Sequence, residues 1–181
     1  HIKISYKIIH YSFSFHSESL TTFSFKCMKF VDSVKIHVRS GNGGSGCTSF
    51  RREKYIPQGG PDGGDGGKGG DVFLVGDKSK NTLLDLSFQQ HQHAENGKNG
   101  GGSDKHGRNG KDLRIPVPLG TVAKIDETGE VLQEVIEKKD YLVFNGGRGG
   151  RGNSRFKSAT NRTPDYHQLG EPGTECWVRL D

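Results

Sequence analysis

The sequence predicts an all-β fold, in which a small antiparallel barrel, sandwich or jelly roll of short strands carries a glycine-rich bundle of rods. Two features predict it: short apolar runs bounded by turn residues, and 28 glycines in 181 residues, many of them spaced by three. Hydrophobic residues make up only 30% of the chain. No run of about 18 apolar residues occurs, which excludes membrane-spanning helices, and the glycine blocks exclude a conventional helix bundle.

The predicted strands are short runs in which apolar and polar residues alternate. In the first, within 30–39, Val34, Ile36 and Val38 share one face. The residues at 126–129 predict a hairpin turn between two later strands, and no segment predicts an amphipathic helix longer than about two turns. The other predicted runs are 71–75, 113–117, 121–125, 131–136, 141–144 and 176–180.

Glycine recurs with a period of three, which is the period of polyproline II rather than of a helix or a strand. The runs are too short for a collagen triple helix, so they predict several polyproline II rods packed side by side, with Gly66 facing a neighbouring rod and Gly67 facing outward. A flexible linker is the alternative. The glycines predicted to be structural are Gly60, Gly63, Gly66, Gly69, Gly97, Gly100, Gly107, Gly110, Gly146, Gly149 and Gly152.

Positive charge is concentrated in one segment of a nearly balanced chain. The formal net charge is +5, but 145–162 holds five cations and no carboxylate, whereas 126–140 holds six carboxylates and two lysines. A local basic segment indicates a surface that faces a polyanion, with a solvated loop as the alternative. The five cations are Arg148, Arg151, Arg155, Lys157 and Arg162.

The cysteines and histidines predict neither a disulfide framework nor a metal site. The three cysteines lie far apart and form no CxxC pair, which favours a reducing compartment. His91 and His93 form an HxH pair, but no carboxylate and cysteine set lies near them in the sequence to complete a zinc site. We therefore interpret both as polar or RNA-facing residues, with a metal role as the alternative.

The first 27 residues differ from the rest of the chain. They hold six serines, six aromatics and no glycine, without the continuous apolar core of a signal peptide or the arginines of a transit peptide. Met28 begins an amphipathic strand pattern. We therefore expect residues 1–27 to be a leader outside the native domain, which spans 28–181. An organelle-targeting leader is the alternative.

No motif in the chain predicts catalysis. Residues 41–46 match GxGxxG, but the pattern indicates a dinucleotide site only where a helix follows, and none is predicted. No GxxxxGK[ST] phosphate loop and no Ser-His-acid set is present. The chain itself is therefore predicted to be non-catalytic, with no cofactor and no metal of its own.

Five segments of the chain, 28–47, 50–72, 94–113, 117–122 and 145–164, carry long motifs. Together they closely resemble the N-terminal domain of the Obg family of ribosome-associated GTPases. The resemblance covers essentially 28–181. Two departures occur: Leu169 stands where the family usually has proline, and Cys176 and Trp177 replace a more charged pair.

The resemblance implies a fold and a function. The implied fold is a small eight-stranded β-barrel from which glycine-rich loops rise as polyproline II rods. The family places a GTPase domain directly after this one, about where residue 181 lies, and that domain uses GTP and magnesium in assembly of the large ribosomal subunit. The resemblance therefore implies a cytoplasmic monomer whose glycine-rich loops contact ribosomal RNA.

The cations between the glycines are the predicted RNA contacts. Arg148 and Arg151 are expected at the tip of a rod, where arginine can pair with phosphates and stack on unpaired bases. A structural polyproline II bundle without a nucleic-acid role is the alternative, and it would need weakly charged outer faces. Besides the five cations of 145–162, the predicted contacts are Lys98, Lys105, Arg108 and Lys111.

The proposed leader generates a prediction for stability. Deletion of residues 1–27 is expected to leave the free energy of unfolding nearly unchanged, because these residues carry no partner pattern for the rest of the chain. Thermal or denaturant unfolding of the shortened chain measures this. A loss above about 2 kcal/mol, the size of a core deletion, would place the leader inside the fold.

Overall fold

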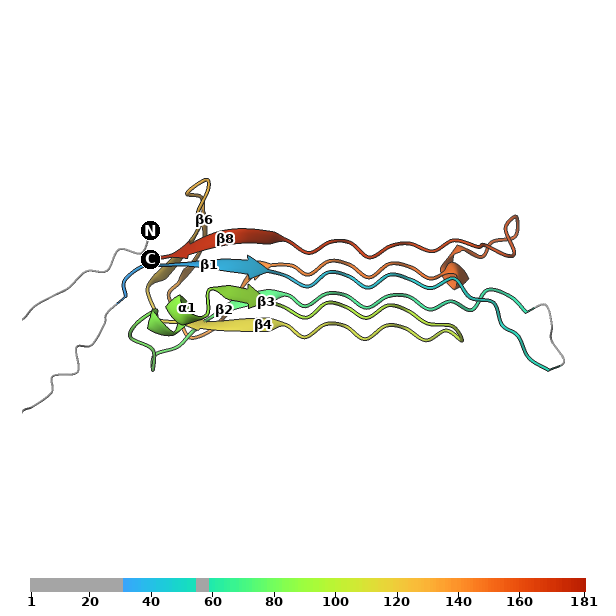
Figure 1. The fold of residues 1–181 in the computed structure, drawn as a ribbon, viewed down its shortest axis with the longest axis horizontal. Coiled ribbons are helices and arrows are strands. Elements are labelled where there is room, and N and C mark those ends of the chain that lie inside the picture. The colour runs from blue at the N-terminus through green and yellow to red at the C-terminus, as the bar shows by residue number, and fades with distance from the viewer. Residues whose placement is uncertain (1–30, 55–58) are drawn as a thin grey trace, which may run out of the picture.

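The computed structural model describes residues 31–54 and 59–181, so the predicted leader lies outside the described residues. Two β-sheets form one end of this part of the chain, and long extended segments run away from them (Figure 1). The strands are β1 (Val34–Arg39), β2 (Val72–Gly76), β3 (His91–His93), β4 (Leu113–Val117), β5 (Thr121–Ile125), β6 (Val131–Val135), β7 (Asp140–Phe144) and β8 (Glu175–Leu180); the helices are α1 (Leu84–Phe88) and the 3-10 helix η1 (Asn153–Phe156).

The two sheets have the strand orders β3-β1-β8-β5-β6 and β4-β2-β7. The all-β prediction is confirmed, and each predicted run overlaps a strand. The three polar residues of β3 were not predicted because they carry no apolar alternation. Among the predicted forms the barrel is wrong, since the two sheets do not close into one. A purely antiparallel arrangement is also wrong, since β1 pairs with β3, and β2 with β4, in parallel.

The parallel pairs follow from the path of the chain. The chain leaves the sheets three times, after β1, β3 and β7, and returns each time into β2, β4 or β8 (Figure 1). Strands that feed outgoing segments therefore share one direction, and strands that receive returning segments share the other. Parallel pairing needs a long connection between the strands, and the outgoing and returning segments supply it.

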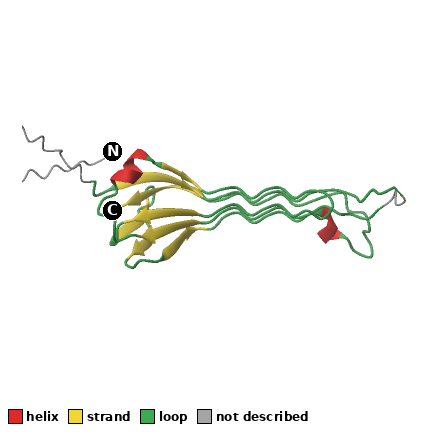
Figure 2. Ribbon diagram, turned by 90° about the horizontal axis from the view of Figure 1, so that it is seen from below, coloured by secondary structure: helices red, strands yellow, loops and turns green. Residues whose placement is uncertain are grey.

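The core lies between the two sheets, which form two layers in Figure 2. The alternation in β1 buries Val34, Ile36 and Val38, as the sequence predicts. Ile36 on one sheet and Ile115 on the other are each at most 1% exposed and belong to one apolar cluster. No helix among residues 31–54 and 59–181 is long and apolar enough to cross a bilayer.

The extended segments are joined by backbone hydrogen bonds at every third residue. The amides of Gly41, Gly44 and Cys47 donate to carbonyls three residues apart on a returning segment, at 2.8–3.0 Å. The amides of other glycines make similar bonds to further neighbours. We call these segments the array, and they lie side by side in both ribbon views. The array consists of 40–47, 62–71, 94–101, 105–112, 145–152 and 167–174.

Close backbone contact explains the need for glycine in the array. A Cβ added to Gly66 would lie 1.9 Å from the Gly44 carbonyl oxygen, and one added to Gly67 would lie 2.2 Å from that of Arg108. The expectation that Gly67 faces outward is therefore wrong, because this segment has neighbours on both sides. A Cβ added to ten of the eleven glycines predicted to be structural would lie within 2.2 Å of a carbonyl oxygen, whereas one added to Gly60 would meet only Lys157 Nζ, at 3.5 Å.

These contacts predict a contrast between two alanine substitutions within the array. Gly66→Ala is expected to lower the free energy of unfolding by about 1–3 kcal/mol or more, because overpacking against a backbone cannot relax easily. Gly101→Ala is the matched control, since its Cβ would lie 3.7 Å from Lys105 Cβ in ordinary contact. It is expected to be neutral, or to stabilise by roughly 0.4–1 kcal/mol. Equal effects at both positions in denaturant unfolding would contradict this account.

Candidate nucleic-acid interface

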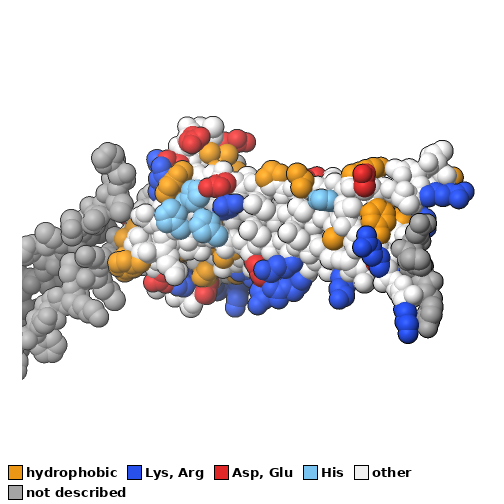
Figure 3. All heavy atoms as spheres, turned by 45° about the vertical axis from the view of Figure 1, so that its right-hand side comes forward, with side chains coloured by type: hydrophobic (Ala, Val, Ile, Leu, Met, Phe, Trp, Pro, Cys, Tyr) orange, Lys and Arg blue, Asp and Glu red, His pale blue; other side chains and the backbone are white. Residues whose placement is uncertain are grey.

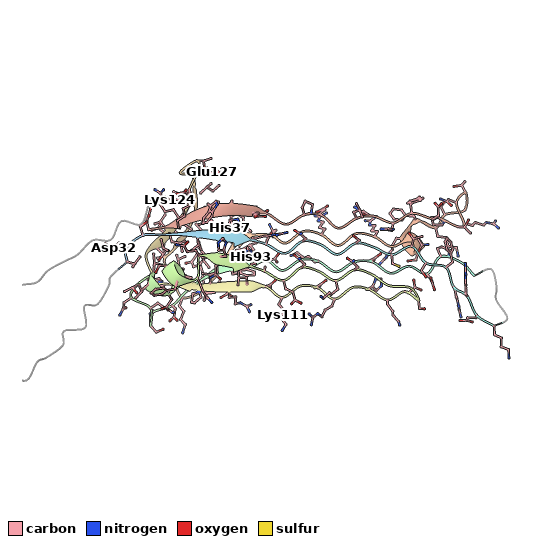
Figure 4. The ribbon with its side chains drawn as sticks, viewed as in Figure 1. Asp32, His37, His93, Lys111, Lys124 and Glu127 are labelled. Carbon is pink, nitrogen blue, oxygen red and sulfur yellow. The ribbon has the colours of Figure 1, made fainter. Side chains whose placement is uncertain are left out.

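The nine cations predicted to contact RNA are all exposed, and they belong to the array or to its end far from the sheets. Figure 3 shows lysine and arginine side chains along one side and at that end. Lys111 marks the other limit of the set, because it lies close to the sheets (Figure 4). The cations therefore cover the length of the array and are not confined to its end.

Hydrogen bonds place several of these cations at matching levels. The Lys98 amide donates to the Arg108 carbonyl at 2.9 Å. The Lys98 carbonyl lies directly beside Gly44, and the Arg148 carbonyl lies directly beside the preceding residue, Gly43. One triplet further from the sheets, the carbonyls of Lys105 and Arg151 lie beside Gly64 and Gly46 in the same way. Side chains from different segments thus form successive levels of positive charge.

Arg151 lies at the outer end of the array, level with Gly46, Gly64 and Lys105, whereas Arg148 lies one triplet nearer to the sheets, so the expected tip position fits Arg151 and is wrong for Arg148. Their carbonyls accept hydrogen bonds from the amides of Glu171 and Gln168 at 2.9 and 2.8 Å. These bonds hold the backbone while both side chains remain exposed. Beyond the array, η1 and the loop after it form the end far from the sheets, and they carry the exposed Arg155, Lys157 and Arg162.

Two of the nine cations are neutralised by carboxylates within the array. Arg108 pairs with Glu95 at 2.6 Å, and Arg155 Nε lies 3.0 Å from Asp65 Oδ2. Within residues 31–54 and 59–181, no salt bridge joins the other seven to a carboxylate. The unpaired cations are Lys98, Lys105, Lys111, Arg148, Arg151, Lys157 and Arg162.

Two aspartates fasten the segment that carries Arg148 and Arg151. Asp65 Oδ1 accepts a hydrogen bond from the Gly152 amide at 2.8 Å, and Asp71 Oδ1 accepts one from the Gly146 amide at 2.7 Å. Burial raises the pKa of each carboxyl, but hydrogen bonds and positive charge outweigh it, so both pKa values lie below their ordinary range. For Asp65 the opposing groups are the Gly152 amide, Arg155 and His106.

The sequence reasoning missed a second set of polar residues that join the segments. Asn96 and Asn99 accept hydrogen bonds through Oδ1 from the amides of Asn42 and Ser45 at 2.8 and 2.9 Å. On the next segment, the acceptors are His106, Asn109 and Asp112, again spaced by three. Their common period with the glycines was visible in the sequence, and it could have identified them as acceptors for amides outside the glycine positions.

In the structure, residues 41–46, which match the GxGxxG pattern, bind neighbouring segments of the array through their backbone amides. The amides of Gly41 and Gly44 donate to Gly70 and Gly67, and that of Gly43 donates to Glu171. No helix follows this segment between residues 47 and 54. A phosphate site of the dinucleotide-binding type needs free amides at a helix N-terminus, and neither feature is present here.

Comparison with known proteins supports the resemblance. A family model described as GTP1/OBG matches residues 31–181. A protein named GTPase Obg from Persephonella marina is 56% identical over 155 residues, covering 85% of this chain and 46% of its relative. One of the same name from Syntrophus aciditrophicus is also 56% identical over 155 residues, covering 85% of this chain and 45% of its own.

The chain belongs to the GTP1/OBG family. It corresponds to the N-terminal domain of Obg proteins and spans less than half the length of the curated relatives it matches. The departures from the family pattern are accommodated locally: Leu169 is 71% exposed, and Trp177 on β8 packs edge-on against His37, with ring centroids 5.0 Å apart.

Asp65 generates a pH-dependent prediction for this Obg domain. Asp65→Ala is expected to lower the free energy of unfolding at pH 7 by about 1–3 kcal/mol, as for removal of charged hydrogen bonds. Because the folded pKa lies below the unfolded one, this contribution is present at neutral pH and disappears as pH falls through the folded value. The difference from the wild type should therefore shrink in acid.

Denaturant unfolding between pH 7 and pH 2 measures this difference. Asp165→Ala is the control, because Asp165 is exposed and no hydrogen bond or ion pair joins it to the described residues. That variant should follow the wild type at every pH. An Asp65→Ala deficit that persists unchanged in acid would show that the carboxylate charge does not fasten the segment.

Proposed function

We propose that this domain docks an Obg GTPase onto ribosomal RNA of the large subunit during its assembly. The observation that carries the proposal is the set of seven exposed cations that no salt bridge joins to a described carboxylate. Five of them lie at successive levels of the ordered array, and Lys157 and Arg162 lie at its end far from the sheets. A phosphate backbone is the polyanion that such a surface fits best. The alternative, a purely structural bundle, needs weakly charged outer faces, and these unpaired cations oppose it.

We further propose that the segments of the array are polyproline II rods. The hydrogen bonds recur every three residues, which is one turn of that helix. At the end of one segment, Gly152 has φ −74° and ψ 165°, near the polyproline II values of about −75° and +145°. Among the described glycines, only Gly120 and Gly129 have positive φ, and both lie in loops of the sheets.

Rigid rods would improve binding in a confined RNA site. A flexible basic loop must lose conformational entropy when it binds, whereas a preorganised one has already lost it during folding. Arginine adds the ability to stack on unpaired bases as well as to pair with phosphates. The array would thus present Arg148, Arg151 and Lys98 to RNA at little entropic cost.

GTP hydrolysis in this proposal belongs to the remainder of the longer protein. The relatives carry the name GTPase Obg, and GTP with magnesium would bind outside this domain. The proposed setting is the cytoplasm, with the domain acting as a monomer on the large ribosomal subunit. An organelle is the alternative if residues 1–27 act as a targeting leader.

Charge reversal of the array tests the proposal. Replacing Arg148 and Arg151 with Glu is expected to weaken binding to large ribosomal subunits strongly, because it removes two cations that pair with phosphates and adds repulsion. The slope of log K against log salt should flatten by roughly 0.7–0.9 for each phosphate that is no longer neutralised. Co-sedimentation with large subunits across a salt series measures both quantities, and the melting temperature should change little since both side chains are exposed.

Two controls separate a local contact from overall charge. Replacing Lys78 and Lys138 with Glu makes the same change in net charge at exposed positions beside the sheets, and it should leave binding nearly intact. Reversing Glu134 and Glu137 to Lys should not reduce binding. Undiminished binding by the Arg148/Arg151 variant, or an equal decrease in the Lys78/Lys138 variant, would remove the array from the contact.

A further inference from the structure

Three histidines meet at the edge of the larger sheet, next to the base of the array. His37 lies on β1, and His91 and His93 lie on the edge strand β3 (Figure 4 labels His37 and His93). The parallel register pairs His37 with His91, and residues two apart on a strand share one face. All three imidazoles therefore lie on the same side of the sheet.

The three rings offer their nitrogens to a common point. One ring nitrogen from each histidine lies within 4.8 Å of the others. In a tetrahedral site with metal–nitrogen bonds of about 2.0–2.1 Å, ligand nitrogens are roughly 3.3–3.4 Å apart. The nitrogens would have to move closer by up to about 1.5 Å, and the exposed His91 and His93 can supply this movement by rotating their side chains.

The contacts of His37 leave one of its ring nitrogens without a hydrogen-bond partner. Its Nε2 lies 3.1 Å from Glu175 Oε1, whereas its buried Nδ1 has no hydrogen-bond partner. A proton on Nε2, donated to the carboxylate, leaves the lone pair of Nδ1 free. A carboxylate that orients a ligating histidine through its other ring nitrogen is a common arrangement in zinc sites.

We infer that His37, His91 and His93 form a binding site for a divalent transition metal of the zinc class. Three neutral imidazoles suit Zn²⁺, Ni²⁺ and Cu²⁺, and they do not suit Mg²⁺ or Ca²⁺, which prefer oxygen ligands. A bound ion would tie β3 to β1. Because the segment 94–101 begins directly after β3, the ion would also fix the base of that segment, far from the end that carries Arg155 and Lys157.

Trp177 provides a local probe of this site. It is the only tryptophan in the chain, and its ring centroid lies 5.0 Å from that of His37 and 5.9 Å from that of His91. Cu²⁺ quenches the fluorescence of an indole at such distances. Titration of the full chain with Cu²⁺ should therefore quench the emission of Trp177 in a saturable manner.

Calorimetry with Zn²⁺ measures the stoichiometry and a melting curve measures the stabilisation. The double variant His91→Gln and His93→Gln changes only exposed side chains, and it should bind one zinc ion fewer than the wild type and lose the saturable quenching by Cu²⁺. Zinc at about 100 times its dissociation constant should raise the melting temperature of the wild type by roughly 5–10 °C, and that of the double variant by much less.

His167→Gln is the matched control, because His167 is exposed and lies outside the cluster. This variant should match the wild type in zinc stoichiometry and in quenching. Histidines of residues 1–30 are present in every variant, so any zinc that they bind cancels in the comparison. Equal stoichiometry, quenching and thermal shift in the wild type and the His91/His93 variant would overturn the inference and leave the cluster as ring packing around Trp177.

Discussion

The array depends on direct contact between backbones. At Gly66 and Gly69 there is no room for a Cβ, because a carbonyl oxygen of the neighbouring segment lies about 2 Å from where it would be. That closeness allows most of the glycine amides in the array to donate to a neighbouring segment. The energy of a net hydrogen bond is modest, near 1 kcal/mol, but the array repeats it along every segment and so offsets the large entropy cost of ordering glycine.

The same constraint decides which residues face outward. Since the glycines take the inner positions, the remaining residues of each triplet either accept hydrogen bonds or extend into solvent. Asn96, Asn99 and Asp65 do the first, while Arg148 and Arg151 do the second. The buried glycines and the exposed cations thus follow the same three-residue repeat, so a change of register in a segment would move both.

The two sheets hold the segments of the array together at one end. All of the strands that continue into the array belong to the two sheets packed on one core, so the core sets the spacing at which the segments begin. The histidine cluster lies at this junction, on β1 and β3. An ion there would add a link between β1 and the three-residue edge strand β3, without altering the surface that we propose for RNA.

The sequence by itself determined the local features of this protein, and only the tertiary structure decided how distant segments meet. Alternation identified strands such as β1, the period of three identified the glycine-rich segments, and long motifs identified the family, because each signal depends on residues close together in the chain. The tertiary structure separated the strands into two sheets, placed Gly67 against Arg108, and put Arg148 on the side of the array instead of its tip. It also brought His37 to His91 across more than fifty residues of sequence. Spacing in one chain carries no record of such contacts, because they depend on the register in which the segments pair.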